Sequence, residues 1–196
     1  MMINWKYYPT YNRCPKHLES IVKVFENNEN IIIEAIERIG EESSNAVLEI
    51  IRADLENLDN SEFQVEITSN GQNKLREIGF PVNEKSQTVI ITRPVLYGDR
   101  GKEEKSYKVD AYCEKNHTIL EVEGGRAFSN HQYLKDIFES CLIIDAEYLV
   151  IAVRNIARKG KKSSSCDFEE ITKELNALYA SDRLSLPLRG LMIIGY

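Results

Sequence analysis

The fold is decided by residues 106–155, SYKVDAYCEKNHTILEVEGGRAFSNHQYLKDIFESCLIIDAEYLVIAVRN. Two stretches typical of strands, 106–113 and 117–123, flank a short polar turn, which predicts a β-hairpin. An amphipathic helix is expected at about 130–145. Residues 148–153, YLVIAV, form an unbroken apolar run of the kind found in strands buried on both faces. The face that the helix would bury carries Leu134, Ile137, Phe138, Cys141 and Leu142.

The segments on either side extend this arrangement into one predicted domain of 196 residues. Residues 1–60 are expected to be mainly helical, with Pro15 opening the first helix and Gly40 ending the second. Residues 62–155 form the predicted catalytic core, in which 97–105 is a polar loop and Pro94 ends a strand or places it at an edge. Residues 156–196 supply a basic loop, a helix and a last strand. The fold class predicted is α/β, with a mixed central sheet flanked by helices and a helical N-terminal part.

Composition narrows the function classes. Hydrophobic residues make up 42% of the chain and charged residues 29%, which is typical of a globular protein. No apolar run approaches the ~20 residues that a membrane helix needs. Residues 1–16 lack the apolar stretch of a signal peptide. A cytoplasmic protein with no membrane partner is therefore expected. The four cysteines form no C-x-x-C pair, which argues against a zinc site. Hydrolase and nucleotide-binding motifs such as G-x-S-x-G and the P-loop are missing.

Three acidic residues fall close together in the predicted hairpin. Whether Lys115 and Asn116 form the turn or 114–117 form a four-residue loop, Asp110 lies opposite Glu121, with Cβ atoms about 4.5–5.5 Å apart. Glu123 is the diagonal neighbour of Asp110 on the same face, at about 7–8 Å. Like charges in such pairs destabilise a sheet, and a hard divalent cation would relieve them. A solvated polar face of an edge hairpin explains the spacing as well.

The same stretch resembles the core of the PD-(D/E)xK nuclease superfamily, and more narrowly the type II restriction endonucleases of the BamHI and BglII kind. The resemblance rests on VDAY, ILEVEGGRAF, the helix that follows and EYLVIAVRN. It implies a restriction-endonuclease-like sheet, Mg²⁺ as cofactor, and Asp110, Glu121 and the backbone carbonyl of Val122 as metal ligands. Glu123 stands where most relatives have lysine, as it does in the BamHI kind, and would orient or deprotonate the attacking water.

Two further residues are possible accessories to this site. Lys135, on the following helix, could serve in the lysine position, although a solvated helical lysine is the alternative. Glu49, in the helical region, could supply a further carboxylate, and the polar face of its own helix explains it equally well.

Two segments are predicted to contact DNA. Arg126, Asn130 and His131 lie between the acids and the helix, a junction that faces the major groove in the enzymes that the chain resembles. Arginine suits guanine and asparagine suits adenine, whereas helix capping or simple solvation explains these residues equally well.

The second segment is the basic stretch 154–165, RNIARKGKKSSS. Arg154 and Asn155 are predicted to read bases. A mobile solvated loop is the alternative. The residues predicted to bind phosphates are Arg158, Lys159, Lys161 and Lys162.

These observations favour a Mg²⁺-dependent, sequence-specific double-stranded DNA endonuclease of the type II restriction kind. A homodimer is expected, because cutting both strands of a palindrome needs two sites related by a two-fold axis. Another nuclease of the same superfamily, acting in repair or on particular DNA structures, is one alternative. A non-catalytic DNA-binding or interaction protein on the same fold is the other.

Overall fold

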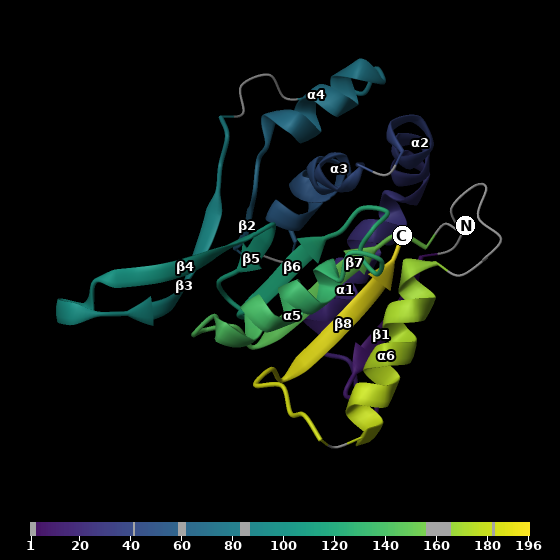
Figure 1. Ribbon diagram of the computed structural model, residues 1–196. Helices are drawn as coiled ribbons and strands as arrows, with labels where there is room; N and C mark the ends of the chain where they lie inside the picture. Colours follow the sequence, from purple (N-terminus) through teal and green to yellow (C-terminus); the bar gives the residue numbers. More distant parts are fainter. Residues whose placement is uncertain (1–2, 41, 59–61, 83–86, 156–165, 182) are drawn as a thin grey trace.

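The computed structural model describes residues 3–40, 42–58, 62–82, 87–155, 166–181 and 183–196. Within these ranges the chain forms six helices, a mixed six-stranded sheet and a separate two-stranded hairpin (Figure 1). The helices are α1 (Lys16–Asn27), α2 (Glu29–Ile39), α3 (Ser44–Glu56), α4 (Ser69–Glu77), α5 (Gln132–Leu142) and α6 (Asp167–Ser181). The strands of the sheet are β1 (Asn4–Tyr8), β2 (Phe63–Val65), β5 (Ala111–Cys113), β6 (Thr118–Val122), β7 (Tyr148–Val153) and β8 (Gly190–Gly195). No helix in these ranges is both long enough and apolar enough to span a membrane.

The sheet has the strand order β1-β8-β7-β6-β5-β2. Strands β6, β7 and β8 run parallel to one another. Strand β5 pairs antiparallel with β6, and β1 pairs antiparallel with β8. Side chains of β7 alternate between two apolar clusters. Val150 and Ala152 pack with α1, α2 and α3, whereas Leu149, Ile151 and Val153 pack with α5 and α6. The central strand is therefore buried on both faces, as its unbroken apolar run predicts.

The hairpin formed by β5 and β6 has the predicted register. Ala111 pairs with Leu120, Tyr112 with Ile119 and Cys113 with Thr118. The next position on each strand is Asp110 and Glu121. A short, local turn fixes this register, because each pairing follows from the loop length.

The predicted helical boundaries in the N-terminal part are confirmed. Pro15 immediately precedes α1. Gly40 ends α2 with φ of 84°, a left-handed conformation that suits glycine. The prediction missed β1, however, which lies at the edge of the sheet and pairs with the C-terminal strand β8.

The predicted polar loop at 97–105 is confirmed for residues 98–102 and is wrong at both ends, which belong to strands. Strands β3 (Ile91–Tyr97) and β4 (Glu103–Val109) form an antiparallel arm joined by a short 3₁₀ turn (Asp99–Gly101), and the arm projects from the sheet (Figure 1). Pro94 lies within β3, beside an irregularity in the pairing, so it does not end the strand. Residues 106–109 of β4 fall in the predicted strand 106–113, but the structure divides that strand at Asp110 and pairs its first part with β3. A two-stranded ribbon without a buried face has no alternating apolar pattern, which explains why the sequence did not reveal residues 103–105.

The buried face of α5 also differs from the prediction. Its buried residues are Tyr133, Asp136, Ile137 and Ser140. Leu134, Phe138 and Leu142 are instead 47%, 61% and 43% exposed. The helix thus turns most of its apolar stripe outward and places an aspartate against the sheet.

Candidate active site

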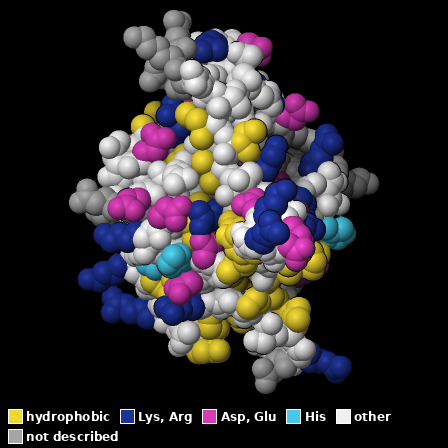
Figure 2. All heavy atoms as spheres, turned by 90° about the vertical axis from the view of Figure 1, so that its left-hand side faces the viewer, with side chains coloured by type: hydrophobic (Ala, Val, Ile, Leu, Met, Phe, Trp, Pro, Cys, Tyr) yellow, Lys and Arg dark blue, Asp and Glu magenta, His cyan; other side chains and the backbone are white. Residues whose placement is uncertain are grey.

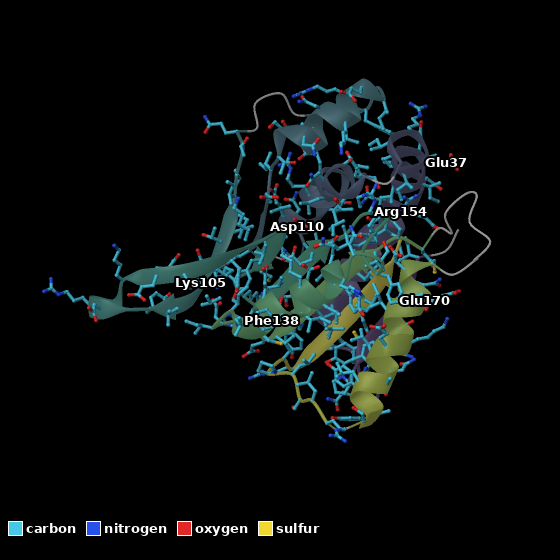
Figure 3. The ribbon with its side chains drawn as sticks, in the orientation of Figure 1. Glu37, Lys105, Asp110, Phe138, Arg154 and Glu170 are labelled. Atoms are coloured by element: carbon cyan, nitrogen blue, oxygen red, sulfur yellow. The ribbon has the colours of Figure 1, made fainter. Side chains whose placement is uncertain are left out.

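The predicted acids meet where β4 gives way to β5 and β6 ends. Asp110 interrupts the long strand formed by β4 and β5, and Figure 3 shows it where the arm joins the sheet. Its Oδ2 accepts a hydrogen bond of 2.7 Å from the Val122 amide, and its carbonyl accepts one of 2.7 Å from the Glu66 amide. Asp110 is therefore bound to the strand that carries Glu121 and lies next to it in the structure.

Glu123 is held at the end of β6 by its backbone. Its amide donates to the Ala152 carbonyl at 2.8 Å, and its carbonyl accepts a hydrogen bond of 2.5 Å from the Tyr196 hydroxyl. Tyr196 is fully buried and its amide donates to the Val153 carbonyl. The position of Glu123 thus depends on the central strand and on the C-terminal residue.

The structure adds Asp136, which the sequence analysis did not identify. Asp136 is 3% exposed and lies on the buried face of α5. Its carboxyl hydrogen-bonds that of Glu123. Its Oδ2 has no hydrogen-bond partner among the described residues. The only signal in the sequence was a polar residue inside an apolar helical pattern, which helix periodicity assigned to the solvent side.

Each of these four carboxyls acts electrostatically on at least one of the others, and we call them the carboxylate cluster (Asp110, Glu121, Glu123 and Asp136). Burial raises the pKa of Asp110 to about 7, and the charges of Glu66 and Glu123 add to the rise. Burial, together with Asp110 and Asp136, raises the pKa of Glu121 well above its usual range. Burial and the charge of Glu123 raise the pKa of Asp136 to about 8. Protons or cations are needed to stabilise such a group of desolvated like charges.

Lys135 is the cation that acts on all four carboxylates. Its side chain is 58% exposed, and its Nζ lies 3.8 Å from Asp136 Oδ1 and 3.5 Å from Glu139 Oε2. Partial burial lowers its pKa, but Asp136 and Glu139 raise the pKa overall. The structure therefore places the predicted lysine beside the cluster.

An open polar cavity of about 320 Å³ adjoins the cluster. It brings together Glu123, Arg126 and Asn130, as predicted, and it adds side chains from the start of α3 and from α4. Lys74 also donates to the Glu42 carbonyl at 2.7 Å. The full lining is Glu42, Ser44, Asn45, Asn70, Lys74, Glu123, Gly124, Gly125, Arg126, Asn130 and Gln132.

Other predicted residues lie elsewhere. Glu49 pairs with Arg52 on its own helix, with Nη2 2.8 Å from Oε1, and α3 packs on the face of the sheet opposite to α5. His131 is exposed at the start of α5 with φ of 54°. Arg154 approaches the Gly40 carbonyl at 3.5 Å, and the Asn155 amide donates to the Tyr196 carbonyl at 2.5 Å. The phosphate-binding candidates Arg158, Lys159, Lys161 and Lys162 fall outside the described residues.

The donor chemistry of the cluster fits a hard divalent cation. Mg²⁺ is bound through one or two carboxylates, with water and substrate phosphate completing its shell. Asp110 and Glu121 are adjacent and desolvated, and would supply those carboxylates. Among the described side chains no group of three or more His, Cys, Asp or Glu could hold a metal ion. A cation at Asp110 and Glu121 would therefore have two carboxylates as ligands, with water and phosphate completing its shell.

Comparisons of the chain with protein-family models, with curated proteins and with solved structures find no match.

The raised pKa values predict a pH-dependent stability for the metal-free protein. Between about pH 4 and pH 8 the carboxyls of the cluster bind more protons in the folded state than in the unfolded chain. They therefore add to the free energy of unfolding at low pH, and this contribution is lost as the pH rises. Asp136→Asn, which mimics the protonated acid, should therefore raise the melting temperature at pH 8 more than at pH 5.5. The expected difference is on the order of 1 kcal/mol, or about 2–4 °C for a chain of this size. Equal shifts at both pH values, measured by calorimetry in EDTA, would contradict the description of the cluster.

Proposed function

We propose that the protein is a Mg²⁺-dependent endonuclease that hydrolyses phosphodiesters of double-stranded DNA at a specific sequence, as type II restriction enzymes do. The observation that carries the proposal is the bond from the Val122 amide to Asp110, which joins Asp110 to the Glu121-Val122-Glu123 strand. The element order supports it too: β5 and β6 are antiparallel, α5 follows, and β7 returns parallel to β6. This is the order on which the resemblance to the PD-(D/E)xK core rests.

Each residue of the cluster has a role in this chemistry. Asp110, Glu121 and the Val122 carbonyl would hold Mg²⁺, which when bound lowers the pKa of water and neutralises charge on the phosphate. Glu123 orients the attacking water and accepts its proton as the water oxygen bonds to phosphorus. The phosphorus–oxygen bond to the leaving group breaks, and that oxygen takes a proton from solvent. The Lys135 ammonium lies where it can offset the negative charge that builds up at phosphorus.

The first test is cleavage of plasmid DNA with Mg²⁺. Discrete fragments support the proposal, whereas a smear would indicate a nuclease without sequence specificity. No cleavage would favour a DNA-binding or interaction protein on the same fold. Asp110→Asn and Glu121→Gln should each lower the cleavage rate at least about 100-fold and leave DNA binding intact, because they remove a metal ligand and not a DNA contact. Glu37→Gln, at an exposed position on α2, is the control and should cleave normally.

The polar cavity is proposed to bind the DNA backbone. Lys74 and Arg126 line it next to Glu123, so phosphates bound there would approach the cluster. Lys74→Ala and Arg126→Ala should each weaken binding to every sequence and lower the slope of log affinity against log salt by up to about 0.9. Lys173→Ala, on the outer side of α6 with its side chain 66% exposed, is the matched control. A salt slope unchanged from wild type in both cavity variants would exclude this surface.

The exposed stripe on α5 is proposed as the contact between two copies of the chain. Leu134, Phe138 and Leu142 recur at every fourth position on one face. Figure 2 shows hydrophobic side chains gathered beside and below the charged tip of the arm. Apolar patches of this kind mark interfaces. Because α5 begins beside the cavity, a dimer formed through this helix keeps both sites close to the interface.

Size-exclusion chromatography with light scattering tests this contact. Phe138→Asp together with Leu142→Asp should convert a dimer into a monomer, because each charge would be buried unpaired in the interface. Leu184→Asp is the matched control, since Leu184 is also 61% exposed and lies outside the stripe. A monomeric wild-type protein, or a stripe variant that remains dimeric, would refute the proposed contact.

A further inference from the structure

We infer that Tyr196 is a positioning residue for Glu123, because its hydroxyl fixes the backbone that directs the Glu123 carboxylate toward the attacking water. The inference rests on the proposed function for the role of Glu123. The hydroxyl donates a hydrogen bond of 2.5 Å to the Glu123 carbonyl, which lies 73 positions away in the sequence. Neither the predicted hairpin nor the resemblance to the nuclease superfamily includes Tyr196.

Glu123 lies just beyond the regular pairing of the sheet. The pairing of β6 with β7 ends at Val122 and Ala152. The Glu123 amide still donates to the Ala152 carbonyl at 2.8 Å, whereas the Glu123 carbonyl accepts its hydrogen bond from Tyr196. Two glycines follow, and glycine restricts the backbone least. Tyr196 therefore supplies the hydrogen bond that fixes the end of the strand.

Tyr196 is itself held on several sides. Its side chain is fully buried, and its ring stacks with that of Phe25 at a centroid distance of 6.0 Å. Its amide donates to the Val153 carbonyl at 2.9 Å, and its carbonyl accepts a hydrogen bond of 2.5 Å from the Asn155 amide. Burial raises the pKa of its hydroxyl well above the usual range, so the hydroxyl stays protonated. A permanent donor of this kind suits orienting Glu123, and not transferring protons.

The two hydrogen bonds lie on opposite sides of the Glu123 α-carbon, so together they fix the direction of its side chain. The carboxyl at the end of that side chain meets the carboxyl of Asp136 on α5. Groups that orient a reactant must stay within about 0.5 Å of the productive geometry. A shift of about 1 Å can slow a reaction by about 100-fold. Removing the Tyr196 hydroxyl should therefore slow the chemical step and leave DNA binding in place.

Tyr196→Phe tests the inference, because it removes the hydroxyl and keeps the ring beside Phe25. With Mg²⁺ and DNA its single-turnover cleavage rate should fall about 10-fold, and its affinity for DNA should stay within about 2-fold of wild type. Tyr8→Phe is the matched control, since Tyr8 is also fully buried and its hydroxyl donates to the Thr172 carbonyl at 3.0 Å. Both variants should melt about 2–4 °C below wild type, but Tyr8→Phe should keep the wild-type cleavage rate.

A double variant shows whether Tyr196 acts through Glu123. Glu123→Gln combined with Tyr196→Phe should cleave within about 2-fold of the rate of Glu123→Gln alone, because the group to be positioned is already lost. A further loss of about 10-fold would show an independent role for Tyr196 and overturn the inference. A Tyr196→Phe variant as fast as wild type, or a Tyr8→Phe variant that is equally slow, would overturn it as well.

Amide hydrogen exchange measured by NMR separates this inference from the proposed function. In Tyr196→Phe the Glu123 amide should exchange at least about 10-fold faster than in wild type, because the end of the strand is released. In Tyr8→Phe it should exchange as in wild type. A protein that cleaves no DNA would refute the nuclease, and the exchange rates would then decide whether Tyr196 fixes Glu123. An unchanged exchange rate of the Glu123 amide in Tyr196→Phe would overturn the inference.

Discussion

Four carboxylates concentrated in one desolvated place are the constraint on which the rest of the structure depends. Each ionised acid removed from water costs free energy, and placing like charges together raises that cost. Apolar clusters on both faces of the sheet offset this cost. Helices α1 to α3 pack on one face, and α5 and α6 pack on the other. Strand β6 passes between these clusters and brings Glu121 and Glu123 to its end, where Asp110, between β4 and β5, and Asp136, on α5, join them. This unfavourable arrangement is the basis on which the cation site is proposed.

The hairpin could be predicted from the sequence because its determinants are local. The four-residue turn at 114–117 sets which residues pair, and the pairs from Ala111 to Cys113 follow from it. Continuing that register places Asp110 opposite Glu121, and the hydrogen bond from the Val122 amide to Asp110 Oδ2 holds it beside β6. The helices at Pro15 and Gly40 were predictable for the same reason, since a proline or glycine sets the backbone where it stands. Local rules thus gave the core of the candidate site.

Features that depend on distant contacts could not be predicted in this way. Strand β1 is defined only by its pairing with β8 at the other end of the chain. The rotation of α5 is set by what the sheet presents to it, and not by its own pattern of apolar residues. Asp136 and the polar cavity, with Asn45 and Lys74 from α3 and α4, were missed because they need the tertiary arrangement.

The orientation of α5 determines two features that the sequence did not reveal. It buries Asp136 on the inner face of the helix, and it exposes a stripe of apolar side chains on the outer face. Fully burying a leucine or phenylalanine side chain contributes about 1.5–3 kcal/mol, so leaving Leu134, Phe138 and Leu142 partly exposed gives up several kcal/mol. Burying an ionised Asp136 costs several more. The exposed stripe opposes the observed orientation at any pH, whereas the buried Asp136 opposes it only where its carboxyl is ionised, above its raised pKa of about 8. The proposed cation on the inner face would offset the second cost, and the proposed second copy of the chain on the outer face would offset the first. Because both act on the same helix, cation binding and association of two chains would each stabilise the orientation that the other requires.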